Sequence, residues 1–372
     1  MMLEGLNKID WHSLDGADGP ADDVPDLLKR LASDNDTVRQ KALDELFGNL
    51  WHQGTIYEVT PFAVPFLIEL LADEAVPGKD GILELLAELA TGSSYWDAHQ
   101  QLSLFADKRN EPGFQETLEE ELGWVRNTRT SIYEGTELYL RLLHHNEAAV
   151  RTACAYLLAC YPENATQSLP EIHQTFQIEE DGLAQSSMLM TIATLGKDQP
   201  QYLSLLLNAL TTSQSGVVKI VSAMELARLT RDKAVPEVGN TLIEALDPPR
   251  ELEAHYHQLP WVRVDITRDV VEHLRLVGSS RVHKAIQILT PFLGDMSRPG
   301  TLYLLLDLTF DERWEKLDIT AKELTDEQKI VLSTIANRSD LWSPQTEAPM
   351  ILRMFGLPDS QGELNNFLAG EL

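Results

Sequence analysis

The chain has 372 residues, of which 58 are acidic and 30 are basic, so its formal net charge at pH 7 is −28. A field of this sign repels nucleic-acid backbones and anionic membranes and attracts basic proteins. We therefore expect a basic protein partner, with no role for nucleic acid or membrane. The alternative is that the charge serves only solubility. Residues 1–150 hold 28 acidic and 11 basic residues, so we expect the attraction to be strongest there.

The compartment is indicated by the cysteines and the N-terminus. Cys154 and Cys160 lack the spacing of metal ligands, and two cysteines in a chain of this length are typical of a reduced protein. The N-terminal sequence has neither the basic nor the apolar region of a signal peptide, and no apolar run is long enough to span a membrane. These features predict a cytoplasmic protein.

Residues 1–23 are expected to form an N-terminal cap. Trp11 can cover the exposed end of the first helical hairpin, and the polar run from Asp15 to Asp23 is typical of a turn. Asp22 or Asp23 is then the expected N-cap of the first helix.

Residues 24–50 carry the clearest helical pattern. Apolar residues from Val24 to Leu31 recur at the spacing of one helix face, and the polar residues 33–36 predict a turn. Asp36 or Thr37 is the expected N-cap of a second helix. Two helices this short cannot enclose a core without a neighbouring pair. The residues of the second helix expected to face inward are Val38, Ala42, Leu43, Leu46 and Leu50.

The segment from Trp51 to Tyr57 connects this hairpin to the next. Aromatic and amide side chains in such a connection are typical of a recognition site on a rigid scaffold. The alternative is a buried corner in which His52 and Gln53 satisfy backbone groups at helix ends. The next pair is expected to begin at Thr60 and to end near Gly92.

Residues 93–134 depart from the pattern and are expected to be an insertion. Its predicted apolar anchors include Trp96, and a helix is expected over residues 116–134. Acidic residues gather in the first turns of that helix, where the helix dipole favours negative charge. Because insertions in helical repeats often lie on the binding face, this acidic group could bind a basic partner; the alternative is a solvated helix start. The acids of this group are Glu116, Glu119, Glu120 and Glu121.

Helix pairs resume at residues 136–160, 168–196 and 202–230. Arg39, Arg151 and Lys219 occupy equivalent positions in the repeated pattern, so we expect them to form one ridge and to pair with acids of the preceding turn, such as Asp36 or Glu147.

Further helices are expected over residues 236–246, 265–276, 282–293 and 299–308, and residues 311–372 are expected to form a C-terminal cap. Thr325 and Gln328 predict a capping box. Glu251 and His255 could bind zinc on a helix, but the surrounding prolines predict an irregular loop over residues 247–261, so no metal site is expected.

The pattern Asp36-x-Val38-Arg39-x-x-Ala42-x-x-x-Leu46 resembles the HEAT repeat. The longer stretch from residue 23 to residue 71, with WHQGT at its centre, and the tail LTDEQKIVL resemble a group of bacterial HEAT-repeat proteins of poorly defined role. The resemblance implies an all-α fold: a right-handed α-solenoid of HEAT-like hairpins (an armadillo-type superhelix), continuous over residues 1–372. Distant members of this class include phycobilin lyase-type proteins and alkylpurine DNA glycosylases.

The sequence contains no GxSxG, HExxH, GxxxxGK[ST] or CxxC motif, so neither a catalytic residue nor a cofactor is predicted. Two functions stand. The favoured one is a non-enzymatic protein-binding scaffold that neutralises or chaperones a basic partner such as a toxin, in an immunity-type role. The alternative is a solenoid enzyme of DNA glycosylase-like or lyase-like type. The residues predicted to bind the partner are Trp51, His52, Gln53, Tyr57, Trp96, Glu116, Glu119 and Glu120.

Overall fold

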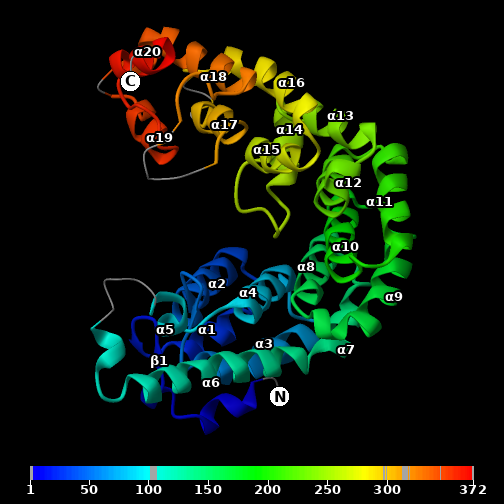
Figure 1. Ribbon diagram of the computed structural model, residues 1–372. Helices are drawn as coiled ribbons and strands as arrows, with labels where there is room; N and C mark the ends of the chain where they lie inside the picture. The colour runs from blue at the N-terminus through cyan, green and yellow to red at the C-terminus, as the bar shows by residue number, and fades with distance from the viewer. Residues whose placement is uncertain are drawn as a thin grey trace. The chain divides into compact units, whose positions relative to one another are not determined.

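A computed structural model describes residues 3–100, 107–295, 298, 300–311, 317, 319–343 and 345–370. The fold is all-α, with helices making up 69% of the chain (Figure 1). Contacts group the chain into two compact units, one comprising Met1–Asp198 with Leu259–Trp261 and the other Gln199–Gln258 with Val262–Leu372.

The helices of the first unit are α1 (Val24–Arg30), α2 (Asp36–Leu50), α3 (Thr60–Ala72), α4 (Lys79–Thr91), α5 (Tyr95–His99), α6 (Phe114–Tyr133), α7 (Thr136–Leu142), α8 (Ala148–Ala159), α9 (Ala165–Phe176) and α10 (Gly182–Leu195). Those of the second unit are α11 (Pro200–Thr212), α12 (Gly216–Thr230), α13 (Pro236–Glu244), α14 (Arg250–Tyr256), α15 (Ile266–Leu276), α16 (Ser279–Leu289), α17 (Thr301–Asp307), α18 (Asp326–Asn337), α19 (Ala348–Met354) and α20 (Gln361–Ala369). Four two-residue strands form two antiparallel hairpins, β1 (Asp15–Gly16) with β2 (Gly19–Pro20) and β3 (Trp51–His52) with β4 (Thr55–Ile56).

The N-terminal segment packs onto the first helices. Trp11 is buried against Phe66 of α3, with 6.0 Å between the ring centroids, and its indole N–H donates to the Leu6 carbonyl at 2.8 Å. The turn predicted in the polar run from Asp15 to Asp23 is present, and it forms the β1–β2 hairpin. Asp23 is the N-cap residue of α1, as predicted, but its side chain makes no capping hydrogen bond.

The α1–α2 pair forms as predicted, with two corrections. The N-cap of α2 is Asn35, not Asp36 or Thr37, because the Asn35 side chain accepts from the Val38 N–H at 3.2 Å. Val38 is 37% exposed and does not face inward. Residues spaced by four drift around a helix by about 40° per step, so a face centred on Leu46 and Leu50 leaves Val38 at its edge.

Four helices of the first unit pack in sequence: α2 contacts α4, α4 contacts α8, and α8 contacts α10 (Figure 1). The contact between α8 and α10 is made close by small and hydroxyl side chains. Buried Ser187 and Thr191 of α10 donate to the carbonyls of Thr152 and Ala155 of α8 at 2.7 and 2.8 Å. Hydroxyl groups are therefore satisfied by the neighbouring helix and add no unpaired polar group to the core.

Two of the three periodic cations occupy equivalent positions. Arg39 donates to the carbonyl of Ser33, and Arg151 donates to the carbonyl of His145, six residues back in each case and at 2.7 Å in each case. Arg39 pairs with Asp36, as predicted. The prediction for Arg151 is wrong, because its guanidinium forms a two-pronged ion pair with buried Glu179 at 2.6 and 2.7 Å and makes no pair with Glu147.

Lys219 has no ion pair with any residue that the structure describes. A lysine ammonium is a single point of charge and lacks the planar fork with which Arg39 and Arg151 reach two partners at once. The predicted ridge of three paired cations is therefore limited to the two arginines.

In the second unit, α12 packs against α11, α13 and α15. The loop predicted over residues 247–261 is wrong in part, because residues 250–256 form α14. Buried Tyr256 anchors this helix by donating to Asp269 of α15 at 2.7 Å. The capping box of α18 is present, with Thr325 and Gln328 bonding to each other's backbone N–H groups. Phe355 is fully buried, consistent with a closing role at the C-terminus.

The Arg151–Glu179 pair gives a pH-dependent prediction. Burial alone would raise the pKa of Glu179, but hydrogen bonds from Arg151 and from the backbone N–H groups of Asp181 and Glu180 hold the pKa below its ordinary value. Replacing Glu179 by Gln should lower the free energy of unfolding at pH 7 by about 2–3 kcal/mol. As the pH falls below the ordinary carboxylate range, the wild type should lose this stabilisation, because the unfolded chain takes up the proton first.

Urea denaturation of the wild type and the Glu179→Gln variant between pH 7 and acid pH measures this. Glu45→Gln is the matched control, since Glu45 lies 3.6 Å from Lys41 in an exposed pair. Equal losses for the two variants, or a difference that does not change with pH, would contradict the prediction.

Candidate functional site

The β3–β4 hairpin presents part of the predicted site. Gln53 and Gly54 connect its strands with φ of 52° and 90°, the left-handed values required by a type I′ turn. The start of the insertion runs along the hairpin: Ser93 N–H donates to the Gly54 carbonyl at 2.8 Å, and Ile56 N–H donates to the Ser93 carbonyl at 2.9 Å. At Gly92 a Cβ would lie 2.5 Å from the Ile56 side chain, so only glycine permits this approach.

The predicted residues of this hairpin differ in exposure. His52 and Gln53 are exposed at the turn, which excludes the alternative of a buried corner for these two side chains. Trp51 is half-buried, with its ring edge-on to Phe47 at 6.4 Å. Its indole N–H is buried and has no acceptor among the described residues. His52 and Gln53 are thus free to contact a partner, whereas Trp51 mainly supports the hairpin.

Tyr57 lies between the hairpin and α3. Its backbone N–H donates to Thr60 at 3.1 Å, and its side chain is half-buried. Burial raises the pKa of its phenol, and the nearby charges of Asp18 and Glu121 raise it further. The phenol therefore stays protonated at neutral pH and can act as a hydrogen-bond donor at this surface.

Glu121 of α6 fixes the first part of the insertion. Its carboxylate is buried and accepts hydrogen bonds from the Ser94 hydroxyl at 2.8 Å and from the Trp96 backbone N–H at 3.0 Å. Ser94 is itself the N-cap of α5, accepting from the Asp97 N–H. One buried carboxylate therefore orients the short helix that carries Tyr95 and Trp96.

Trp96 lies in an aromatic cluster and is half-buried. Its ring is edge-on to Tyr95 at 5.2 Å and to Phe114 at 5.3 Å, and Tyr95 stacks on His99 at 4.6 Å. Tyr95 is 38% exposed. Trp96 therefore holds α5 on α6, and Tyr95 is the aromatic side chain of this cluster that a partner reaches most easily.

The acids of α6 divide between two faces. Phe114, Glu121, Thr128 and Ile132 are the buried residues of this helix. Glu116, Glu119 and Glu120 lie on the other face and are exposed, around a shallow hollow that Gln115 and Arg126 complete. Arg126 pairs with Glu119 at 2.8 Å, whereas Glu116 and Glu120 have no ion pair with any residue that the structure describes.

Arg129 fixes the second half of α6. Its guanidinium donates to the Ala90 carbonyl of α4 at 3.0 Å, to the Cys160 carbonyl after α8 at 2.9 Å, and to Glu163 at 2.8 Å. The same group lies 4.4 Å from the centroid of the Tyr161 ring. The acidic face of α6 is therefore presented at a fixed angle to its neighbours.

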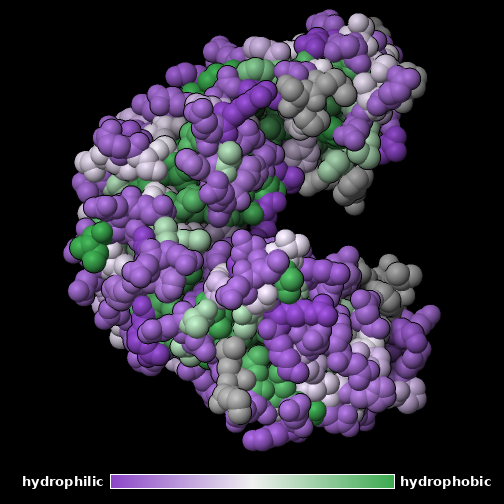
Figure 2. All heavy atoms as spheres, turned by 180° about the vertical axis from the view of Figure 1, so that it is seen from behind, coloured by the Kyte–Doolittle hydropathy of each residue, from purple (hydrophilic) through white to green (hydrophobic). Residues whose placement is uncertain are grey.

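The predicted residues lie on elements of the first unit that contact one another: Ser93 runs along the β3–β4 hairpin, and α6 contacts both α5 and β4. We call these elements together the hairpin–insertion surface, comprising the β3–β4 hairpin, Tyr57, α5 and the α6 residues Phe114–Glu121. The part of the insertion over residues 101–106 lies outside the described residues. Figure 2 shows hydrophilic side chains over most of the face in view, with hydrophobic ones in smaller patches among them.

Sequence reasoning did not identify the roles of Glu121, Tyr95 or Ser93. A signal for Glu121 exists, because it follows Phe114 by seven residues and precedes Thr128 by seven, which puts all three on one face. Elsewhere in the described ranges, no group of three or more His, Cys, Asp or Glu side chains could hold a metal ion. No described helix has the length and apolar character needed to cross a membrane.

No protein-family model matches the chain, and a search of the curated proteins finds no match. Among solved structures, one engineered protein from the Northeast Structural Genomics Consortium aligns with a TM-score of 0.34 at 15% identity, covering 94% of this chain and 90% of its own. A second from the same consortium aligns with a TM-score of 0.33 at 15% identity, covering 68% of this chain and 98% of its own. Membership of the HEAT-repeat group stays a prediction.

The bonds of Arg129 predict the stability of this surface. Replacing Arg129 by Met should lower the free energy of unfolding by about 2–3 kcal/mol, because two helix-end carbonyls and Glu163 lose a charged donor. Replacing Arg126 by Met on the same helix should change it by at most about 0.5 kcal/mol, because its only described partner is exposed Glu119. Urea denaturation of both variants measures the difference. Equal effects would show that Arg129 does not hold α6.

Proposed function

We propose that the chain is a right-handed α-solenoid of HEAT-like hairpins. Support comes from the succession of contacts from α2 through α4 and α8 to α10. Further support comes from Arg39 and Arg151, which reach the same backbone position in two different helix pairs. In this proposal α5 and α6 are an insertion into a repeat array over residues 1–372, with residues 1–23 and 311–372 as its caps.

We propose that the protein is a non-enzymatic scaffold that binds a basic protein through the hairpin–insertion surface. The observation that carries this is that exposed His52, Gln53 and Tyr95 and the exposed acids of α6 are carried by elements that contact one another and are held by buried groups. Buried Glu121 and Arg129 hold the elements that carry them, so these groups meet a partner with little loss of conformational freedom. Rigid display of aromatic and polar groups is typical of binding surfaces.

The charge of the chain supports a basic partner. Residues 1–150 contribute 28 acidic and 11 basic residues to a chain whose net charge is −28. Such a field accelerates the approach of a basic protein and weakens as salt is added. Neutralising or chaperoning a basic protein such as a toxin is the role proposed here. It places the protein in the cytoplasm, where the free thiols of Cys154 and Cys160 would stay reduced.

The alternative of a DNA glycosylase-like enzyme gains no support from this surface. Such an enzyme needs cations that face the duplex. Arg126, Arg129 and Arg151 are each paired with an acid of this chain. The proposal therefore keeps to protein binding.

The test is capture of partners from the source cell on the immobilised full chain, followed by affinity measurement with each purified partner. Wild type should retain a basic protein at about 50 mM salt and release much of it at about 300 mM, because salt screens the field. The variant Glu116→Gln/Glu119→Gln/Glu120→Gln should bind at least about tenfold more weakly. His52→Ala/Tyr95→Ala should lose about 1–2 kcal/mol of binding free energy.

The control removes three exposed acids of the second unit, as Asp232→Asn/Glu237→Gln/Glu244→Gln. It has the same change in net charge and should bind like wild type. If the control and the α6 variant lost affinity equally, only net charge would matter and the proposed surface would be wrong. Unchanged affinity in both surface variants would exclude it as well.

A further inference from the structure

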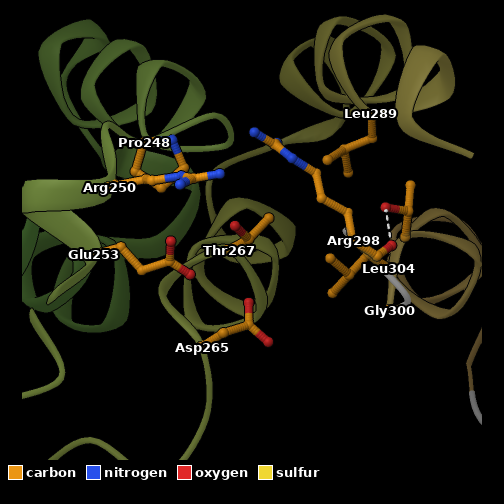
Figure 3. A pocket seen from close by; sticks show the side chains of 10 residues that line it. Pro248, Arg250, Glu253, Asp265, Thr267, Leu289, Arg298, Gly300 and Leu304 are labelled. Atoms are coloured by element: carbon orange, nitrogen blue, oxygen red, sulfur yellow. Dashed lines mark hydrogen bonds between the residues drawn. The ribbon is translucent and has the colours of Figure 1, made fainter. Parts of the chain in front are cut away.

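The second unit contains a pocket of about 350 Å³ that is separate from the hairpin–insertion surface. Its walls come from α14, the start of α15, the end of α16 and the segment leading into α17. Figure 3 shows mainly polar side chains from these elements around the opening, together with the apolar side chains of Leu289 and Leu304. A volume of this size lies within the range of pockets that hold small molecules.

Arg298 is fixed in the wall of this pocket. Its guanidinium lies 3.9 Å from the centroid of the Phe292 ring and forms an ion pair with Asp247. Its backbone carbonyl accepts from the Thr301 hydroxyl at 2.9 Å, which is the bond drawn in Figure 3. Stacking and pairing leave other N–H groups of the guanidinium available, so the charge is positioned before any ligand arrives.

Arg250 approaches from the opposite wall. It is the first residue of α14, is exposed, and has no hydrogen bond or ion pair from its side chain to any residue within the described ranges. In Figure 3 its side chain extends toward that of Arg298. Two guanidinium groups directed at one another repel, and an anion between them would turn that repulsion into two charge-assisted interactions.

The rest of the pocket carries hydrogen-bond acceptors. Glu253, Asp265 and Thr267 line it on the side away from the two guanidinium groups (Figure 3). Asp265 uses one carboxylate oxygen to accept from the Arg268 N–H at 3.0 Å, which leaves the other available. Carboxylates accept hydrogen bonds from hydroxyl groups and disfavour a second anion. The pocket is therefore cationic at one side and suited to hydroxyl groups at the other.

We propose that this pocket binds a small phosphorylated polyol of the sugar-phosphate class. The phosphate would lie between Arg250 and Arg298, and the sugar hydroxyls would donate to Glu253 and Asp265 or bond with Thr267. Two guanidinium forks match the several oxygens of a phosphate. Glu253 and Asp265 select against ligands that carry a second negative charge at the far end.

Isothermal titration calorimetry on the full chain tests this with three probes: ribose 5-phosphate, inorganic phosphate and ribose. Ribose 5-phosphate should bind with a dissociation constant below about 1 mM, and more tightly than either fragment. Arg250→Gln and Arg298→Gln should each weaken it about tenfold or more. Arg231→Gln, at an exposed arginine of the same unit outside the pocket, should leave it unchanged.

Thr267→Val separates the two ends of the ligand. This substitution should weaken the binding of ribose 5-phosphate severalfold and leave the affinity for inorganic phosphate unchanged. The proposal is overturned if ribose 5-phosphate does not bind, if inorganic phosphate binds as tightly, or if Arg231→Gln weakens binding as much as Arg250→Gln. Arg250 is exposed, so its replacement should keep the fold, which circular dichroism would verify.

Discussion

The first unit depends on how the ends of its packed helices are satisfied. The last carbonyls of an α-helix have no partner within the helix and carry the negative end of its dipole. Arg129 donates to such carbonyls at the ends of both α4 and α8, and the Tyr161 hydroxyl donates back to the Arg129 carbonyl at 3.0 Å. Lys79 has the same role for α3, since its ammonium is buried and donates to the Leu71 carbonyl at 2.7 Å. Arg129 and Lys79 therefore have a structural role, because they satisfy the carbonyl groups at helix ends.

A second constraint is that α8 and α10 bury more than one face. Nine of the twelve residues of α8 are buried. Small residues are frequent in both helices beside the large apolar ones, and their hydroxyl and thiol groups donate to carbonyls, as Cys154 does to Tyr139 at 2.8 Å. Burial of the thiol also raises the pKa of Cys154 well above its ordinary value, so this cysteine is inert at neutral pH.

Local sequence signals predicted most of the helices, because apolar periodicity and capping residues act over a few residues. The capping box at Thr325 is of this kind. The predictions were wrong where contacts between residues distant in the sequence determine the structure. α14 forms in a proline-flanked stretch because Tyr256 is anchored on Asp269, and Arg151 selects Glu179, 28 residues ahead, over nearby Glu147.

The same distinction explains the candidate site. The sequence indicated exposed polar and aromatic residues near Trp51 and in the insertion, because such residues rarely occur in a helical core. The sequence did not show which of these polar and aromatic residues are exposed to solvent and which are buried and support the exposed ones. Glu121 belongs to a run of glutamates and only its position on α6 makes it a buried acceptor, while Trp96 packs inward and Tyr95 remains exposed.

Arginines also pair with buried acids of this strongly acidic chain. Self-repulsion at a net charge of −28 opposes compaction, and a buried carboxylate without a partner would add a further cost. Arg151 pairs with buried Glu179, Arg228 with buried Glu225, and Arg275 with buried Asp307. Other arginines pair with exposed acids such as Asp26 and Glu119, but acidic residues outnumber basic ones by 58 to 30, so the outward field stays negative. Arg250 differs from these arginines, because it has no partner among the described residues and faces a second guanidinium group. In our proposal the phosphate of a ligand is its partner.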